Sequence, residues 1–358
     1  MQDITITAEG RTLSHVYAGE RLAGVLPHIA AYPSVYVVCD DNVASTVTFL
    51  TQQANVVSMV SLKATEEEKD ISTVMAVCQW LLDSGADRNS LLLAIGGGIT
   101  TDIAGFAASI YKRGIRFAYI PTTLLAQVDA ALGGKTGVNF HNYKNMIGVV
   151  RQPEFTYECV EVLESLPERE FRSGTAELLK TFIIENKNDN YSRAVRLFSE
   201  GHPGGDEFTK LILAAAAVKA GVVGRDQFEG GERRKLNLGH TFAHAIEWAA
   251  HSAEQKKAED EDITHGEAVA IGIILAARLS ERLGLCSKEE ASHIREDFIS
   301  CHLPVELPYS LDVLAEAMHR DKKADGTKVH FVLIKAIGDV ITKEMTPEEV
   351  IGILMREE

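Results

Sequence analysis

The feature that most constrains the fold is a run of three glycines (96–98) between an apolar segment and a helical pattern. Ser90–Ile95 (SLLLAI) contains no charge, and Asp102–Tyr111 has apolar residues at helical spacing. Arg116–Ile120 then has the pattern of a further buried strand. Strand, glycine turn, helix and strand in this order predict a parallel α/β sheet.

The same alternation begins earlier and stops near Gln152, after which the character of the chain changes. Ser34–Cys39 is a β-branched run, and Ile71–Leu82 has helical periodicity. Beyond residue 152 only Val329–Ile334 has the pattern of a strand. We therefore expect an α/β domain with a Rossmann-like parallel sheet over residues 1–152 and a mostly α-helical domain over 153–358, with a cleft between them. Helices are expected at Ser173–Glu185, Phe208–Val223, Gly239–Ala250, His265–Leu283, Lys288–Phe298 and Leu311–His319, and a solvated connection at Glu254–Asp262.

Composition and charge narrow the class of protein. Hydrophobic residues make up 46% of the 358 residues, as in soluble globular proteins. There is no uncharged apolar run of membrane-spanning length and no basic start followed by an apolar stretch. The five cysteines are scattered without CxxC spacing, which argues against disulfides and cysteine zinc sites and favours the cytoplasm. A net charge of −15 makes nucleic acid and anionic membrane poor partners.

The glycine turn has the chemistry of a phosphate-binding site. Glycines allow close backbone approach, and the start of the following helix offers free amides to an anion. Thr122 and Thr123 close the next strand at its carboxyl end, where open α/β sheets bind ligands. The GxGxxG fingerprint is absent, a tight turn without a ligand would have the same sequence, and Asp102 could simply cap the helix.

Cations gather around a second glycine-rich segment. Lys135 lies within Gly-Gly-Lys-Thr-Gly, and Lys144 and Asn145 follow it closely. The P-loop spacing is absent, which excludes an ATPase of that kind. A single lysine is by default a surface residue, but Lys135 and Lys144 together with Arg113 and Arg116 favour binding of an anionic ligand.

Histidines and one glutamate form a second candidate site. His240 and His244 are four residues apart, on one face of the expected helix. His265 begins another helix, and Glu177 lies where we expect the start of a third. Each could serve as a cap or a core residue, but together they favour a mixed His/Glu catalytic metal site with open positions. Cationic side chains accompany them, and a sugar phosphate with a carboxylate would need such a set: Lys180, Lys219 and Arg233.

An ordered series of motifs resembles the 3-dehydroquinate synthase family from about residue 35 to about residue 335. The motifs are GGGITTDIAGFAASIYKRG, IPTTLLAQVDAALGGKTGVN, KNMIG, AELLK, NLGHTFAHAIE, HGEAVAIG and DKK. Two departures, GITTD and TEEEK, affect backbone near the expected nucleotide. The resemblance implies that the N-terminal domain binds a dinucleotide, that the C-terminal domain binds a metal, and that the protein is a homodimer.

The resemblance also implies the residues of each site. It implies NAD contacts at Asp40, Asn42, Glu66, Lys69, Gly97, Gly98, Ile99, Asp102, Thr122, Thr123, Lys135 and Lys144. It implies metal ligands at Glu177, His240 and His265, usually for zinc or else cobalt, so that His244 contacts the substrate phosphate instead of the metal. It implies substrate contacts at Arg113, Asp129, Lys135, Asn145, Lys180, Lys219, Arg233, Asn237, His244 and Lys323, with Lys322 a weaker choice than Lys323.

The implied reaction converts 3-deoxy-D-arabino-heptulosonate 7-phosphate into 3-dehydroquinate and phosphate. NAD oxidises the C5 hydroxyl, phosphate is eliminated with the phosphate itself as base, the ketone is reduced again, and an aldol closure forms the ring. A metal- and NAD-dependent polyol or glycerol-phosphate dehydrogenase is an alternative that would not need the phosphate and carboxylate contacts. A related sugar phosphate cyclase making an inosose or a valiolone would not need Arg233 and Asn237, and a non-enzymatic scaffold would have lost site residues.

Overall fold

The computed structural model describes residues 2–141, 143–201, 203–251, 263–321 and 328–356. The chain forms two compact units, one of Met1–Pro167 with Lys219–Phe228, and one of Glu168–Val218 with Glu229–Glu358. We call them the sheet unit and the helical unit. The predicted connection Glu254–Asp262 and the predicted substrate contact Lys323, with its neighbour Lys322, lie outside the described residues.

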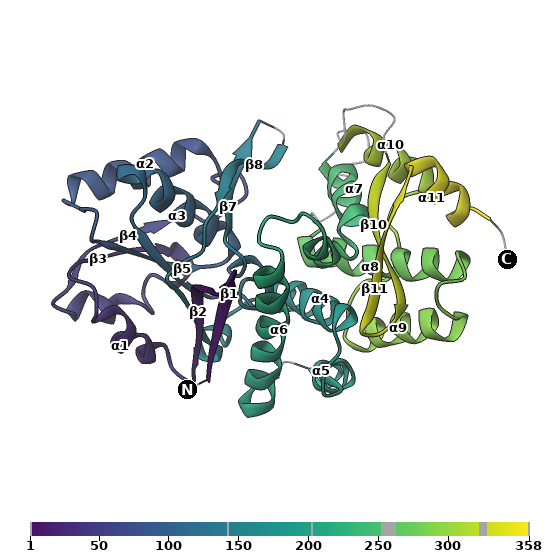
Figure 1. Ribbon diagram of the computed structural model, residues 1–358, viewed down its shortest axis with the longest axis horizontal. Helices are drawn as coiled ribbons and strands as arrows, with labels where there is room; N and C mark the ends of the chain where they lie inside the picture. The colour runs from purple at the N-terminus through teal and green to yellow at the C-terminus, as the bar shows by residue number, and fades with distance from the viewer. Residues whose placement is uncertain (1, 142, 202, 252–262, 322–327, 357–358) are drawn as a thin grey trace. The chain divides into compact units, whose positions relative to one another are not determined.

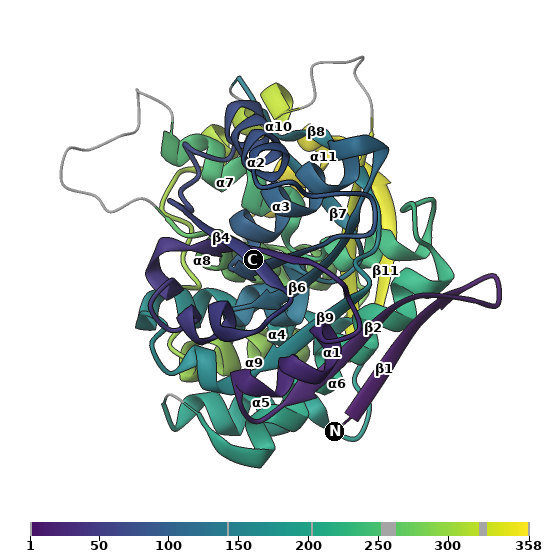
Figure 2. The ribbon, with the colours of Figure 1, turned by 90° about the vertical axis from the view of Figure 1, so that its left-hand side faces the viewer.

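The sheet unit is built on seven strands in the order β1-β2-β9-β6-β5-β3-β4 (Figures 1 and 2). All neighbouring pairs are parallel except β1 and β2, which form a hairpin. This confirms the parallel α/β fold that the glycine turn predicted. The strands are β1 (Gln2–Ala8), β2 (Arg11–Gly19), β3 (Val35–Asp40), β4 (Val56–Leu62), β5 (Leu91–Gly96), β6 (Arg116–Pro121) and β9 (Phe155–Cys159).

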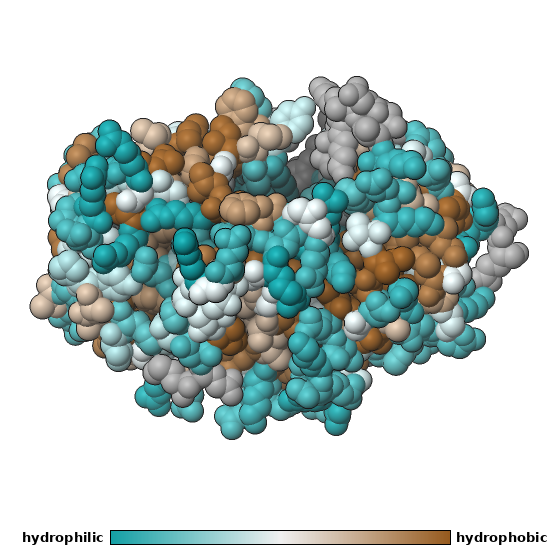
Figure 3. Space-filling model, in the orientation of Figure 1, coloured by the Kyte–Doolittle hydropathy of each residue, from teal (hydrophilic) through white to brown (hydrophobic). Residues whose placement is uncertain are grey.

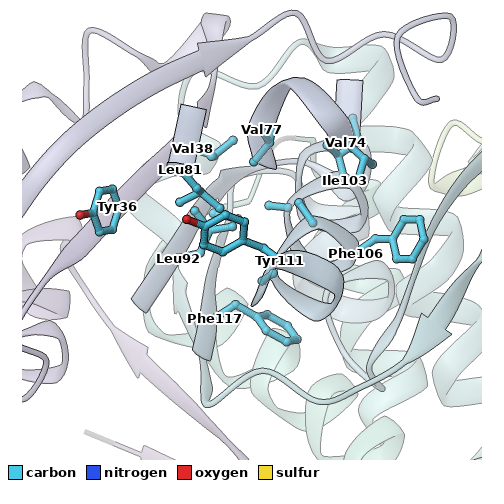
Figure 4. Close-up of a cluster of buried hydrophobic side chains, with 14 of the residues drawn as sticks. Tyr36, Val38, Val74, Val77, Leu81, Leu92, Ile103, Phe106, Tyr111 and Phe117 are labelled. Carbon is cyan, nitrogen blue, oxygen red and sulfur yellow. The ribbon is translucent and has the colours of Figure 1, made fainter. Parts of the chain in front are cut away.

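Helices α2 (Ile71–Asp83) and α3 (Gly98–Ile110) pack on the sheet through a hydrophobic core (Figure 4). The sheet supplies side chains such as Leu92 and Phe117, and the helices supply Leu81 and Ile103. Because the interior strand β5 is buried at every position, its sequence is continuously apolar instead of alternating. This unit also contains a short helix α1 (Leu26–Ile29) and a separate hairpin of β7 (Lys135–Phe140) with β8 (Tyr143–Val150).

The helical unit contains most of the helices that the periodicity predicted. The predicted helices are α4 (Glu168–Ile184), the first part of α6 (Gly205–Arg225), α7 (His240–His251), α8 (His265–Arg282), α9 (Lys288–Ser300) and α10 (Leu311–Asp321). Two further helices, α5 (Asn190–Ser199) and α11 (Pro347–Leu354), were not predicted. The expectation of a single strand is wrong, because β10 (Val329–Ala336) pairs with β11 (Asp339–Met345) in an antiparallel hairpin. Most of β11 is exposed and polar, so an apolar pattern could not reveal it.

Hydrophilic side chains cover much of the face seen in Figure 3, between separate hydrophobic patches. Among the large apolar residues that are exposed, Tyr143, Met146 and Val149 belong to β8. Within the described part of the chain, the helices are all too short or too polar to cross a lipid bilayer.

Candidate active site

Close contact between α4 and α8 brings the predicted metal ligands together. Gly266 follows His265 at the start of α8, and a Cβ atom on Gly266 would lie 2.2 Å from the carbonyl oxygen of Ser173 on α4. The amide of Gly266 donates a hydrogen bond of 2.9 Å to Ser173 Oγ. Because Glu177 lies one turn after Ser173 on the same face of α4, this contact places the Glu177 carboxylate beside the start of α8.

The start of α8 is further fixed by a capping box and an ion pair. The Thr264 hydroxyl accepts from the amide of Glu267, while the Glu267 carboxylate accepts from the amide of Thr264 at 2.8 Å. Arg169 on α4 donates two hydrogen bonds to the same carboxylate, at 2.9 and 2.8 Å. The capping box and the ion pair therefore both fix the end of α8 that carries His265.

A close contact between two glycines brings His240 beside the other two candidate ligands. A Cβ on Gly272 would lie 2.2 Å from the carbonyl oxygen of Gly239, so α8 passes directly against the segment before α7. Gly239 has a φ of +79°, a conformation that side chains other than glycine rarely adopt. His240 follows it as the first residue of α7.

The three side chains converge on one point. Ligand atoms of Glu177, His240 and His265 all lie within 4.8 Å of one another. The Nε2 atom of His240 is 3.5 Å from Glu177 Oε1, and the Nε2 atom of His265 is 3.4 Å from the same oxygen. Two imidazole nitrogens and a carboxylate form the kind of donor set that zinc and similar divalent metals take, with positions left for other ligands.

The opposite nitrogen of each ring also has a partner. The Nδ1 atom of His240 is 3.2 Å from the carbonyl oxygen of Leu238, and the Nδ1 atom of His265 is 3.3 Å from Glu247 Oε1. Lys180, buried on α4, forms an ion pair with the second oxygen of Glu177. The two residues are three positions apart and share one face of α4. The expectation that Glu177 lies at the start of this helix is wrong, because it lies in the middle of α4.

Charge and burial perturb all three candidate ligands. Burial opposes ionisation of Glu177, but Lys180 and the two imidazoles lower its pKa well below the usual range. Burial, assisted by Lys180, lowers the pKa of His240 to about 3. Burial acts in the same direction on His265, but hydrogen bonds to Glu177 and Glu247 outweigh it and raise its pKa to about 10. Such strongly perturbed groups cluster at functional sites.

The sheet unit places a second group of predicted residues along the carboxyl edge of its parallel strands. Gly96 at the end of β5 is opposite Pro121 at the end of β6, and Cys39 in β3 is opposite Ile95. Asp40, the glycine turn and Thr122 therefore lie along one edge of the sheet, where ligands bind in open α/β folds. Gly97 caps α3 without a side chain, which leaves the helix start open to an anion.

A buried lysine connects several of the predicted cofactor contacts. Lys69 Nζ lies 2.6 Å from Asp102 Oδ2 and 2.6 Å from Asn145 Oδ1. Asn139 donates to Glu66 Oε1 at 2.8 Å and accepts from the amide of Asn145 at 2.9 Å. The possibility that Asp102 caps α3 is wrong, because the cap is Gly97 and Asp102 lies one turn inside the helix. Burial raises the pKa of Asp102, and the ammonium of Lys69 opposes that shift.

Lys219 illustrates how a charge in an alanine-rich helix is accommodated. It lies in the part of α6 that belongs to the sheet unit, is 6% exposed, and forms an ion pair with Asp129. Asp129 lies in a π-helical turn over Ala126–Ala130, a distortion that is frequent at functional sites. A buried charge of this kind is costly unless it meets an opposite charge, and the Asp129 carboxylate supplies one within the protein itself.

The other predicted residues divide between the two units. In the sheet unit, Arg113 is exposed with a φ of +67°, Lys135 begins β7, Lys144 lies in β8, and Ile99 lies in the first turn of α3. Asn42 donates to Asp40 Oδ1 at 2.9 Å from both its amide and its side chain, and Thr123 Oγ1 accepts from the amide of Ala126. In the helical unit, Arg233 is buried, Asn237 donates to Glu229, and His244 is exposed with its ring centroid 5.8 Å from that of His240.

Three features of the site were not predicted from the sequence: Glu247, Ser173 and the helix-packing glycines of the helical unit. Glu247 ends the NLGHTFAHAIE motif, and its place seven residues after His240 puts both on one face of α7. That spacing was the available signal for Glu247. The role of Ser173 could not be read from sequence, because it depends on the distance between α4 and α8.

Comparison with known protein families extends over most of the chain. A family model described as 3-dehydroquinate synthase N-terminal matches residues 59–173, and one described as 3-dehydroquinate synthase C-terminal matches residues 174–324. The first range contains Lys69, Asp102 and Asn145, and the second contains the Glu177, His240 and His265 triad.

Individual relatives give the same picture. The 3-dehydroquinate synthase of Campylobacter concisus is 41% identical over 84% of this chain and 83% of its own. That of Acidithiobacillus ferrooxidans is 43% identical over 80% of this chain and 78% of its own. Among solved structures, the 2-epi-5-epi-valiolone synthase of Streptomyces hygroscopicus, with NAD+ and Zn2+ bound, is 27% identical with a TM-score of 0.84 and covers 98% of both chains.

Proposed function

Because this chain belongs to the 3-dehydroquinate synthase family, we propose that it converts 3-deoxy-D-arabino-heptulosonate 7-phosphate into 3-dehydroquinate and phosphate. The reaction makes it a carbon–oxygen lyase that eliminates phosphate and closes a carbocycle, in the shikimate pathway to aromatic amino acids. The observation that carries the proposal is the convergence of Glu177, His240 and His265.

The residues of the helical unit suit a divalent metal. The Glu177 carboxylate is fully buried and anionic, and both imidazoles direct Nε2 toward it, so the triad offers one oxygen and two nitrogen donors. Glu177, His240 and His265 would hold zinc or cobalt. The partner of each Nδ1 atom leaves Nε2 as the donor toward the metal.

The residues of the sheet unit suit NAD. The open start of α3 would accept the pyrophosphate, while Asp40 and Asn42, at the end of the neighbouring strand, would contact the adenosine side. Glu66, Lys69, Gly97, Gly98, Ile99, Asp102, Thr122, Thr123, Lys135 and Lys144 complete the proposed set. When bound, NAD would supply reversible hydride transfer at a substrate alcohol, and the metal would supply a Lewis acid for its oxygens.

The chain's own side chains would bind the anionic ends of the substrate. Lys135, Asn145, Lys219 and His244 would hold the phosphate, with Arg113 and Asp129 as further contacts. Arg233 and Lys180 would hold the carboxylate end, with Asn237 beside them. Lys219 and Lys180 already face carboxylates, Asp129 and Glu177, so each cation is oriented before substrate arrives. Lys323 completes the proposed set.

We place the enzyme in the cytoplasm, because its five cysteines are free and disulfides are rare in reducing compartments. We also propose a homodimer, which the family resemblance implies. Light scattering should then give about twice the chain mass of 39.1 kDa, and a mass equal to one chain would contradict it.

The proposed reaction is tested by following phosphate release and NADH absorbance together. With the heptulosonate phosphate, NAD and zinc or cobalt, we expect phosphate to be released without net NADH, because the hydride returns to the substrate. Accumulating NADH without phosphate would indicate a polyol dehydrogenase. Equal or faster turnover of a sugar phosphate that lacks the carboxylate would indicate a sister cyclase.

A further inference from the structure

A buried carboxylate behind the candidate metal site has no role in the function proposed above. Glu247 lies on α7, and its residue is 6% exposed. Its Oε1 atom is 3.3 Å from Nδ1 of His265, on the side of the ring away from Glu177. A buried carboxylate is costly unless a donor meets it, so a specific interaction must keep Glu247 inside the helical unit.

The contact determines which nitrogen of His265 can bind a metal. Glu247 can only accept, so Nδ1 must carry the proton that it donates. Nε2 is then the atom that faces Glu177, at 3.4 Å. A histidine that binds through Nε2 needs this arrangement, because a rotated ring would turn the donor atom away from the other ligands.

His240 has the same arrangement with a different acceptor. Its Nδ1 faces the carbonyl oxygen of Leu238 at 3.2 Å, and its Nε2 faces Glu177 at 3.5 Å. The backbone acceptor is part of the turn before α7 and cannot be removed by substitution. Of the two histidine partners, the carboxylate of Glu247 is therefore the one that mutation can test.

We propose that Glu247 is a positioning residue that orients His265 and selects its Nε2 atom for metal binding. This inference rests on the proposed function, because it requires the metal at Glu177, His240 and His265. Glu247 would not touch the metal or the substrate and would act through the imidazole alone. Its negative charge would also make Nε2 a better electron donor.

A purely structural ion pair would look similar in the folded protein, so the test must separate metal affinity from folding. Zinc affinity is measured by competition with a chromophoric chelator, and the cobalt-substituted protein is examined by visible absorption. The temperature of unfolding is measured separately in EDTA. The variants are Glu247→Ala, which removes the acceptor, and Glu247→Gln, whose amide oxygen can still accept from Nδ1–H.

We expect Glu247→Ala to weaken zinc binding by about 10- to 100-fold, the usual effect of removing such a partner. Glu247→Gln should retain most of the affinity, because it keeps an acceptor without the charge, and the cobalt absorption bands should shift in Glu247→Ala. The matched control is Glu207→Gln, which removes a carboxylate that pairs with Arg193 in the same unit. Its zinc affinity should equal that of the unmodified protein.

Unchanged zinc affinity and cobalt spectrum in Glu247→Ala would overturn the inference. So would an equal loss of affinity in Glu207→Gln, because the effect would then be general. If Glu247→Ala does not fold, Glu247→Asp decides, because its shorter side chain withdraws the carboxylate from Nδ1 of His265, and unchanged zinc affinity in that variant refutes the role. His265→Ala separates this inference from the proposed function. If this variant binds zinc as tightly as the unmodified protein does, the metal site proposed at Glu177, His240 and His265 is wrong.

Discussion

The two candidate sites are built in different ways. In the helical unit, backbones approach so closely at Gly266 and Gly272 that the positions of the ligands follow from the packing of α4, α7 and α8. In the sheet unit, polar side chains at the strand ends hold one another, as Lys69 holds Asp102 and Asn145. We therefore expect the site in the helical unit to be most sensitive to changes in side-chain volume. The site in the sheet unit should be most sensitive to changes in side-chain charge.

The largest effect is expected from removing a ligand of the helical site. His265→Ala should abolish both metal binding and turnover, since two protein ligands hold zinc far more weakly than three. Metal content by mass spectrometry and phosphate release should fall together while circular dichroism stays unchanged. His293→Ala, at an exposed position on α9, is the control. An active variant without metal would contradict the ligand assignment.

The substitution Gly266→Ala, which adds a single methyl group, should reduce zinc binding and activity nearly as much as His265→Ala. Because its Cβ would lie 2.2 Å from backbone of Ser173, α8 must shift at the residue next to His265. Overpacking of this kind costs about 1–3 kcal/mol of unfolding free energy, and we expect most of the bound zinc and activity to be lost.

Gly352→Ala is the matched control for this substitution, because open space surrounds that glycine on α11. Thermal unfolding and zinc stoichiometry should be unchanged or slightly improved there. Full zinc content in Gly266→Ala would mean that helix packing does not position the candidate ligands of the helical unit. It would contradict the proposed difference between the two sites.

In the sheet unit, Lys69→Met keeps much of the side-chain length and removes the charge. A charge-assisted hydrogen bond is worth about 1.5–3 kcal/mol, so we expect NAD to bind roughly tenfold to a hundredfold more weakly, with zinc binding intact. Fluorescence titration with NAD measures the effect, and Lys63→Met, an exposed lysine, is the control. Equal NAD affinity in Lys69→Met would remove Lys69 from the proposed cofactor site.

The smallest effect on activity is expected at Glu158, a buried carboxyl on β9. Neither of its oxygens has a hydrogen-bond partner among the described residues, and burial raises its pKa well above the usual range. Between its ordinary and its raised pKa, the folded chain holds a proton that the unfolded chain releases. Stability should therefore fall as pH rises through this window, by up to about 1.4 kcal/mol per pH unit.

Glu158→Gln should remove this slope and gain stability relative to the unmodified protein as pH increases, with turnover unchanged. Denaturant unfolding at several pH values measures it, and Glu164→Gln, at an exposed position, should retain the slope. A parallel pH dependence in Glu158→Gln and the unmodified protein would show that Glu158 is not a buried neutral acid.

Much of the fold could be predicted because it depends on local patterns. The apolar run of β5, the glycine turn and the helical periodicities each report their own segment, and the structure has all of them. The hairpins β7–β8 and β10–β11 were missed for the same reason. Strand β8 is mostly exposed and β11 is largely polar, so neither has a buried face to produce a pattern.

The sequence by itself determined which residue types could bind a metal or an anion, and that His240 and His244 share a helix face. Only the tertiary structure decided that His240 directs Nε2 to Glu177 while His244 stays exposed. Helical spacing aligns side chains along one helix, but it says nothing of the neighbouring helices. The contacts of α8 with Ser173 and Gly239, and the contact between His265 and Glu247, are set by packing between segments distant in sequence.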